Sequence, residues 1–176
     1  MSRMGSEFMK NSDMRNELLN IGNGAHALAI QILGNREDAA DAVHDAFISV
    51  LARPEAYDPD KGPFRPWFLR VLRNRCIDLL RLRRTGGQAD ETLIEPGLLP
   101  EQRFENLQRE EQLRQALSGI SSQQRQIVIL RDYLDLSYAE IAVVLEIAAG
   151  TVMSRLHRAR LALKKELERD DKASAD

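Results

Sequence analysis

Apolar residues recur at helical spacing along most of the chain, and no alternating run of β-branched residues indicates a strand. We therefore expect an all-α protein. Gly34 and Asn35 have the character of a helix C-terminus, and Pro66 suits the first turn of a helix. Helices are expected at about residues 14–33, 35–52, 66–84, 101–117 and 122–133, with two more from residue 137 onward.

A stretch rich in Gly and Pro, residues 85–100, divides these helices into two groups. It contains three acidic residues and no basic one, and fully extended it reaches at most roughly 50 Å. We expect a flexible acidic linker between two small helical domains, residues 9–84 and 101–170, rather than one shared core. Residues 1–8 look like a cloning scar, and residues 171–176 are expected to form a disordered tail.

The last two helices have the pattern of a helix-turn-helix. Residues 137–140, Ser-Tyr-Ala-Glu, match a capping box at the start of the first one. At 100° per residue, the second helix gathers Val152, Leu156, Ala159 and Leu163 within one arc, which we assign to the core. Short polar groups and cations occupy the rest of its surface, as DNA recognition requires, although protein-binding modules share this shape. The opposite face carries Ser154, His157, Arg158 and Leu161, with Arg155 and Arg160 on the flanks.

The helix at residues 66–84 divides in the same way. Its apolar side consists of Phe64, Phe68, Val71, Leu72, Leu79 and Leu82. Its other side consists of Arg70, Arg73, Asn74, Ile77, Arg81 and Arg84. Arginine suits phosphate, and the Asn74 amide can both donate to and accept from a base. Trp67, at the edge of that side, either stacks on an unpaired base or is a half-buried core residue, and we favour the second reading.

Charge is segregated along the chain, which the formal net charge of −2 conceals. Residues 65–84 contain seven arginines and one acid, and residues 151–165 contain five basic residues and no acid. Residues 35–60 contain seven acids and two arginines. Two separate basic segments favour a nucleic-acid partner, although two solvated helix faces have the same composition.

Composition excludes several other classes. An apolar content of 43% and a charged content of 30% are those of a folded globular chain. The single cysteine, Cys76, cannot form an internal disulfide and is expected to pack as a small hydrophobe. No apolar run approaches the ~20 residues of a membrane span, so no membrane insertion is expected and the cytoplasm is the expected location. Scattered histidines, with no nucleophile constellation or phosphate-binding loop, predict neither an enzyme nor a metal or cofactor.

Together these segments resemble the alternative bacterial sigma factors of the extracytoplasmic-function (ECF) type, from about Ala25 to Leu167. One helix-turn-helix would be weak evidence, but both halves in this order with an acidic linker are strong evidence. The residues that carry the resemblance are 33–39, 45–47, 67–70 with Asn74, Arg75 and Asp78, 137–142, 150–152 and 154–160.

The resemblance implies that the N-terminal domain, region two, docks on core RNA polymerase and opens the promoter −10 element. By position, the docking residues are Asp38, Asp41, His44, Asp45 and Phe47. The −10 residues are Arg70, Arg73, Asn74, Asp78, Arg81 and Arg84. The family holds a flipped-out base in a pocket to which Asn74 corresponds.

The resemblance further implies that the C-terminal domain, region four, reads the −35 element. Base contacts are expected from Ser154, His157 and Arg158, and phosphate contacts from Thr151, Arg155 and Arg160. The family usually has an anti-sigma factor as a partner.

This chain departs from the family pattern at a few places. Met153 stands where Lys or Arg is frequent, and Ala148 and Ala149 stand where a helix cap is usual. Glu146 stands where Gly is frequent, and a positive φ there would cost roughly 1–2 kcal/mol. Two other readings stay open at this point: a sigma-like decoy that binds an anti-sigma factor, and a conventional helix-turn-helix regulator.

Overall fold

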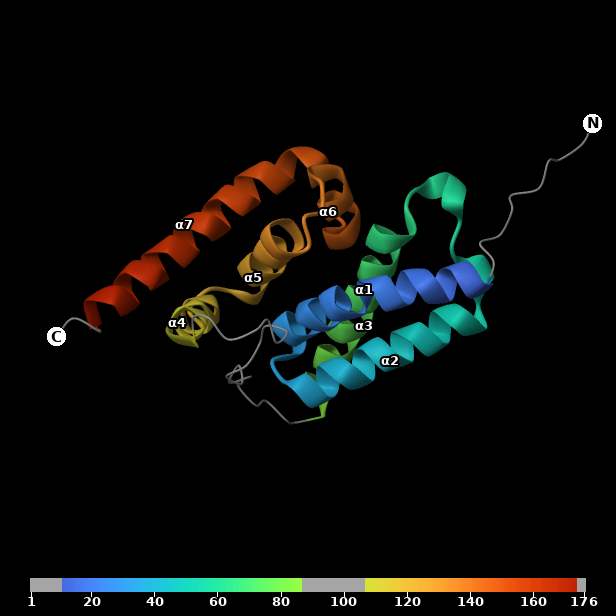
Figure 1. The fold of residues 1–176 in the computed structure, drawn as a ribbon, viewed down its shortest axis with the longest axis horizontal. Helices are drawn as coiled ribbons and strands as arrows, with labels where there is room; N and C mark the ends of the chain where they lie inside the picture. Colours follow the sequence, from blue (N-terminus) through green and yellow to red (C-terminus); the bar gives the residue numbers. More distant parts are fainter. Residues whose placement is uncertain (1–10, 87–106, 174–176) are drawn as a thin grey trace, which may run out of the picture.

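The computed structural model describes residues 11–86 and 107–173, and all regular structure in these two ranges is helical (Figure 1). The all-α prediction is therefore confirmed. Residues 1–8, most of the linker and residues 174–176 lie outside the described ranges. The elements are α1 (Asn11–Leu33), α2 (Arg36–Ala52), η1 (Pro54–Ala56), η2 (Pro59–Lys61), α3 (Phe64–Thr85), α4 (Leu107–Ser118), α5 (Ser122–Val128), η3 (Ile129–Tyr133), α6 (Tyr138–Leu145) and α7 (Ala149–Ala173).

Helices α1, α2 and α3 pack together as the N-terminal unit. The turn between α1 and α2 follows from two residues: Gly34 adopts a φ of 83° and donates to the carbonyl of Ile30, and the Asn35 side chain caps α2 by accepting from the Asp38 N–H at 2.8 Å. Alanines recur on the inner face of α2, which lets α2 lie close to α1. The unit's core contains Leu28, Leu33, Phe68 and Leu72, all without solvent exposure.

An aromatic cluster fixes the loop before α3. The rings of Tyr57, Phe64 and Trp67 lie with centroids 5.1–5.5 Å apart, and the Tyr57 hydroxyl donates to the carbonyl of Gly62. Trp67 is half-buried in this cluster, as we favoured, and Cys76 is buried. Leu82, which was predicted on the apolar side, is 68% exposed and does not belong to the core.

Helices α4 to α7 form the C-terminal unit. The predicted capping box is present, since the Ser137 hydroxyl accepts from the Glu140 N–H and the Glu140 carboxylate accepts from the Ser137 N–H. Val152, Leu156 and Ala159 are buried as predicted. The helix predicted at residues 122–133 changes at Ile129 into a π-helical turn. Helix α7 continues to Ala173, past residue 171 where the tail was expected to begin.

The two units pack against each other instead of standing apart. Helix α1 contacts α5 and η3, and α3 contacts α6. Gly24 lets α1 approach Leu134, the residue after η3, because a Cβ at Gly24 would lie 2.4 Å from Cδ2 of Leu134. Buried residues of both units form one continuous apolar cluster. The protein therefore has two helical units, as predicted, and the structure packs them against each other, an arrangement that the sequence left open.

Candidate nucleic-acid interface

The polar side of α3 carries the residues predicted for the −10 element. Arg70, Arg73 and Asn74 are half-buried, while Asp78, Arg81 and Arg84 are exposed. Asp78 and Arg81 form an exposed ion pair one turn apart, at 3.7 Å. The six residues therefore divide into an exposed C-terminal group and a half-buried N-terminal group, of which Arg70 and Arg73 lie beside the other unit.

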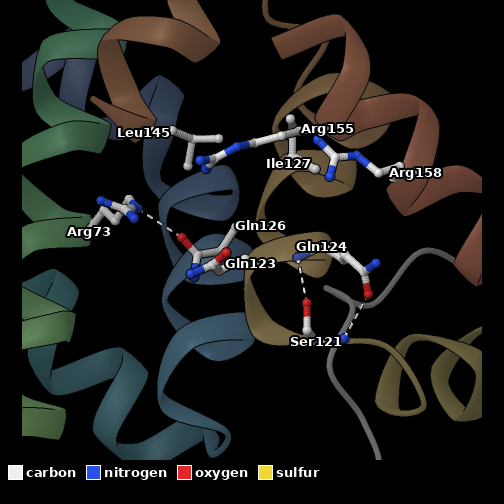
Figure 2. A pocket seen from close by; sticks show the side chains of 9 residues that line it. All are labelled: Arg73, Ser121, Gln123, Gln124, Gln126, Ile127, Leu145, Arg155 and Arg158. Carbon is white, nitrogen blue, oxygen red and sulfur yellow. Dashed lines mark hydrogen bonds between the residues drawn. The ribbon is translucent and has the colours of Figure 1, made fainter. Parts of the chain in front are cut away.

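Arg73 bonds across the boundary between the units. Its Nε donates to Oε1 of Gln126 in α5 at 2.8 Å (Figure 2). Burial lowers the pKa of Arg73, the positive charge of Arg155 lowers it further, and the negative charge of Glu146 opposes both. Gln126 is a buried amide of α5, and nothing in the sequence marked it as a partner for this arginine.

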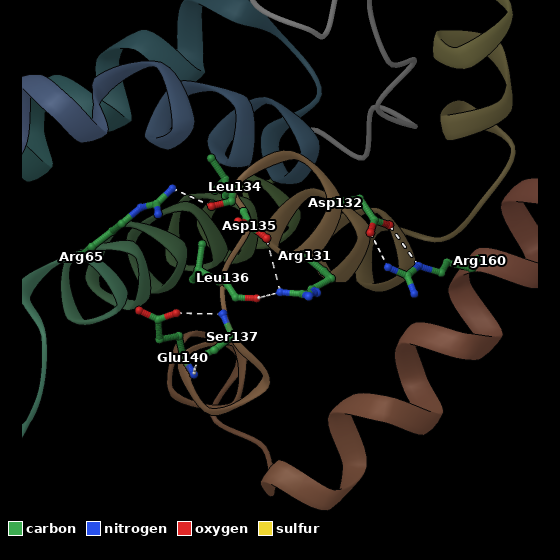
Figure 3. Close-up of polar contacts among 9 residues, drawn as sticks. All are labelled: Arg65, Arg131, Asp132, Leu134, Asp135, Leu136, Ser137, Glu140 and Arg160. Atoms are coloured by element: carbon green, nitrogen blue, oxygen red, sulfur yellow. Dashed lines mark hydrogen bonds and ion pairs between the residues drawn. The ribbon is translucent and has the colours of Figure 1, made fainter.

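Two further hydrogen bonds join the units. Arg65 donates from a terminal guanidinium nitrogen to the carbonyl of Leu134 at 2.8 Å (Figure 3), and the Ser122 hydroxyl donates to the carbonyl of Gln31 at 3.3 Å. Both acceptors are backbone groups, so sequence patterns could not have indicated either bond.

The outward side of α7 presents the residues predicted for the −35 element. Ser154, Arg155, His157 and Arg158 are exposed, and Thr151 is half-buried. The Ser154 hydroxyl donates to the Thr151 carbonyl at 3.1 Å, and Nε of Arg158 donates to the Ser154 carbonyl at 3.3 Å. These bonds fix side chains on the helix surface without taking them out of solvent.

Arg160 is the exception on α7, because its guanidinium forms an ion pair with a residue of another element. Its Nε lies 3.2 Å from Oδ2 of Asp132, and a second guanidinium nitrogen contacts Oδ1 (Figure 3). Hydrogen bonding to Asp132 raises the pKa of Arg160. A phosphate contact was predicted for this residue, and in the structure it ties α7 to η3.

Two non-glycine residues with positive φ lie in the turns that precede α6 and α7. Glu146 has a φ of 55° at the C-terminus of α6, the conformation that its position implied. Asp135, with a φ of 52°, was not foreseen. The loop around it is supported by Arg131, which donates to the Leu136 carbonyl at 2.8 Å (Figure 3). The Arg131 guanidinium also lies over the Tyr138 ring, 5.5 Å from its centroid.

The outer side of α2 carries the residues predicted to dock on polymerase. Asp41, His44 and Asp45 are exposed, and Phe47 packs at 5.4 Å from Phe68 between ring centroids. Burial opposes ionisation of Asp38, but hydrogen bonds from Asn35 and Arg83 outweigh it and lower the pKa of Asp38.

A shallow cavity of about 340 Å³ lies between α2 and α3. Asp45 and Arg75, 3.2 Å apart, stand at its rim, and Ile48, 53% exposed, lines it. Ile48 was missed because a single outward isoleucine on a helix gives no sequence signal.

Two larger cavities lie between the units. One, of about 640 Å³, places Trp67 and Arg70 opposite Glu140 and Val143 of α6. The other, of about 350 Å³, brings Arg73 of α3 together with Arg155 and Arg158 of α7 (Figure 2). Residues that were assigned to two distant DNA elements therefore meet in this arrangement.

Residues 11–86 and 107–173 contain neither a candidate metal site nor a candidate membrane span. No group of three or more His, Cys, Asp or Glu side chains there could hold a metal ion. No helix in the same ranges is both long and apolar enough to cross a bilayer.

Similarity to known proteins follows the same division into two units. Residues 22–85 match the family model described as Sigma-70 region 2, and residues 110–163 match the one described as Sigma-70, region 4. The ECF RNA polymerase sigma factor SigW of Bacillus subtilis is 28% identical over 154 residues, which cover 81% of this chain and 82% of SigW. The ECF RNA polymerase sigma factor SigL of Mycobacterium tuberculosis is 32% identical over 143 residues, 80% of each chain.

A solved structure is similar over nearly the whole chain. The sigma factor RpoE from Bartonella quintana, crystallised with the anti-sigma factor NepR, superposes with a TM-score of 0.75 at 27% identity. The similarity covers 89% of this chain and 98% of RpoE.

Proposed function

The chain belongs to the family of ECF RNA polymerase sigma factors, which are transcription initiation factors. On that premise we propose which of its residues bind core RNA polymerase and which bind the two promoter elements. The protein binds core RNA polymerase and directs it to promoters with −35 and −10 elements, where it opens the DNA at −10. We assign region two to residues 9–84, the linker to 85–100 and region four to 101–170. The supporting observation is one basic helix side in each unit, on α3 and on α7.

The −10 element is the proposed ligand of α3. Arginine forks bind phosphate in two-bond geometry, and the half-buried Asn74 stands among them with an amide that matches a base edge. Capture of a flipped-out base in the pocket of Asn74 offsets the few kcal/mol that unstacking costs. The proposed contacts are Arg70, Arg73, Asn74, Asp78, Arg81 and Arg84.

The −35 element is the proposed ligand of α7. Ser154, His157 and Arg158 lie on the exposed side opposite the buried residues of the helix, where base edges in the major groove are within reach. Thr151, Arg155 and Arg160 flank them and are proposed to bind phosphates. Arg160 must give up its bond to Asp132 to do so.

Core polymerase is the proposed ligand of the outer side of α2. Asp41, His44 and Asp45 are exposed there, so they are available to a partner, and Ile48 supplies apolar area beside them. Phe47 and Asp38 are proposed to support this surface. Phe47 packs on Phe68, and the Asp38 carboxylate accepts hydrogen bonds from Asn35 and Arg83.

A further partner and the cellular setting follow from family membership. Because RpoE from Bartonella quintana forms a complex with the anti-sigma factor NepR, we propose that an anti-sigma factor also binds this chain. The protein acts in the cytoplasm, without enzymatic activity of its own and without a metal or cofactor.

In vitro transcription tests the function directly. Core polymerase and genomic DNA fragments are incubated with and without the protein, and the RNA 5′ ends are mapped. New start sites that share spaced −35 and −10 elements are expected. Failure to bind core polymerase, with tight binding of an operator by the protein alone, would instead identify a conventional regulator.

Asn74→Ala tests the residue assignment. We expect it to impair promoter opening, measured by permanganate reactivity of unpaired thymines, much more than core binding, measured by fluorescence anisotropy. Asn20→Ala, an exposed asparagine of α1, is the matched control and should change neither. An equal loss of opening and core binding in Asn74→Ala contradicts the base-capture role.

A further inference from the structure

Three arginines from the two units surround one cavity of about 350 Å³. Arg73 enters it from α3, and Arg155 and Arg158 enter from α7 (Figure 2). Gln123 and Gln124 of α5 complete its polar wall. Arg73 is the one lining residue from the N-terminal unit, so the set of three arginines is complete only when the two units are packed together.

None of these three arginines forms an ion pair with a carboxylate within the described part of the chain. Other arginines pair with carboxylates: Arg83 with Asp38, and Arg75 with Asp45. By contrast, Arg73 bonds the neutral amide of Gln126, and Nε of Arg158 bonds a backbone carbonyl. In residues 11–86 and 107–173, no carboxylate oxygen lies within 4.0 Å of a guanidinium nitrogen of the three cavity arginines.

The electrostatics of Arg73 agree with this picture. Burial and the like charge of Arg155 both lower its pKa, and the charge of Glu146 opposes them. Two cations thus repel each other across a partly desolvated space, and an anion between them would relieve the repulsion.

The size and the donors of the cavity select the class of anion. Planar guanidinium groups bind phosphate through paired hydrogen bonds. A volume of about 350 Å³ is at the small end of ligand sites and is too small for a DNA duplex. We propose that this cavity binds a compact phosphate chain, either inorganic polyphosphate or the phosphates of a nucleotide, when the two units are packed together.

Such a ligand has a regulatory consequence. It stabilises the packed arrangement by mass action, because its site is incomplete when the units separate. The same three arginines are proposed contacts to promoter DNA, so ligand and promoter exclude each other. This competition rests on the proposed function, whereas binding of the phosphate chain does not.

Isothermal titration calorimetry of sodium tripolyphosphate into the full chain, at fixed ionic strength, tests the site. One ligand per chain is expected. Arg73→Ala and Arg155→Ala should each weaken binding about tenfold or more, since each removes charge-assisted hydrogen bonds. Arg109→Ala, an exposed arginine of α4, is the matched control and should stay within about twofold. Arg73→Gln, which keeps a donor for Gln126, repeats the test if Arg73→Ala does not fold.

Two outcomes overturn the proposal. Equal weakening by Arg109→Ala means general attraction to positive charge. A loss in Arg155→Ala without one in Arg73→Ala means that the anion binds α7 alone.

A comparison of ATP with tripolyphosphate then identifies the source of the phosphates. Tighter binding of ATP supports the site with a nucleotide as its ligand, and equal affinity supports it with the phosphate chain alone as its ligand.

Discussion

Helices α3 and α7 have the same design but different surroundings. Each has one apolar and one basic side. The apolar side of α7 is buried at Val152, Leu156 and Ala159, and most of its basic side is in solvent. Helix α3 lies against α1, α2 and α6, so its basic side is half-covered where Arg70 and Arg73 lie. In the packed arrangement, the −35 residues are accessible while part of the −10 set is not.

The difference predicts an order of events at a promoter. Helix α7 can meet DNA while the units remain together, whereas α3 needs them to separate first. Three side-chain hydrogen bonds resist that separation, donated by Arg65, Arg73 and Ser122. Each contributes about 0.5–1.5 kcal/mol, and the apolar cluster that the two units share adds to this resistance, so we expect the units to separate only when core polymerase binds.

The largest effect tests whether the two helices share one folding unit. Leu72 in α3 and Leu156 in α7 are both fully buried, so Leu72→Ala and Leu156→Ala should each lower the free energy of unfolding by about 2–5 kcal/mol. Because both belong to one apolar cluster, urea denaturation should show a single transition in each variant.

The matched control for this experiment is Leu82→Ala, since Leu82 is 68% exposed on the same helix as Leu72. It should change the free energy of unfolding by about 0.5 kcal/mol or less. The contrary result is two separate transitions, with Leu156→Ala shifting only one of them. It would show that the units unfold independently and that α3 and α7 do not share one folding unit.

How much the sequence predicts differs between the two units. The helix-turn-helix was predictable in detail, because its capping box, its buried arc and the strained Glu146 all depend on local spacing. The contacts between the units were not, because they depend on which surfaces meet in three dimensions. Arg73 was expected on a DNA-binding side, and only the structure gives it Gln126 as a neighbour.

The second prediction concerns the accessible helix alone. Arg158→Ala should cost about 1–3 kcal/mol at one −35 base pair, because a guanidinium that reads a base edge is lost. Transcription from a set of promoters with single −35 substitutions measures it. Lys165→Ala, also exposed on α7, should leave base preference unchanged. A uniform loss over all promoters makes Arg158 a phosphate contact instead.

The third prediction uses the turn between α6 and α7. Glu146 has a φ of 55°, which costs a non-glycine residue roughly 1–2 kcal/mol. Glu146→Gly removes that strain but adds freedom to the unfolded chain, so a net gain of about 0.5–1 kcal/mol in the free energy of unfolding is expected. Glu146→Ala removes the carboxylate and keeps the strain, so a similar gain in that variant contradicts the explanation.

The smallest expected effect concerns the ion pair between Arg160 and Asp132. It tests whether Arg160 binds a DNA phosphate or serves only to position α7. Arg160 and Asp132 are 49% and 41% exposed, so their ion pair should contribute no more than about 1 kcal/mol to stability in a double-mutant cycle. Asp132→Ala frees the guanidinium for phosphate and removes a negative charge near the DNA, so −35 binding should tighten about twofold or more at low salt. Arg160→Ala should weaken −35 binding and abolish the gain from Asp132→Ala. If both single variants weaken DNA binding equally, the ion pair positions α7, and Arg160 is a structural residue rather than a phosphate contact.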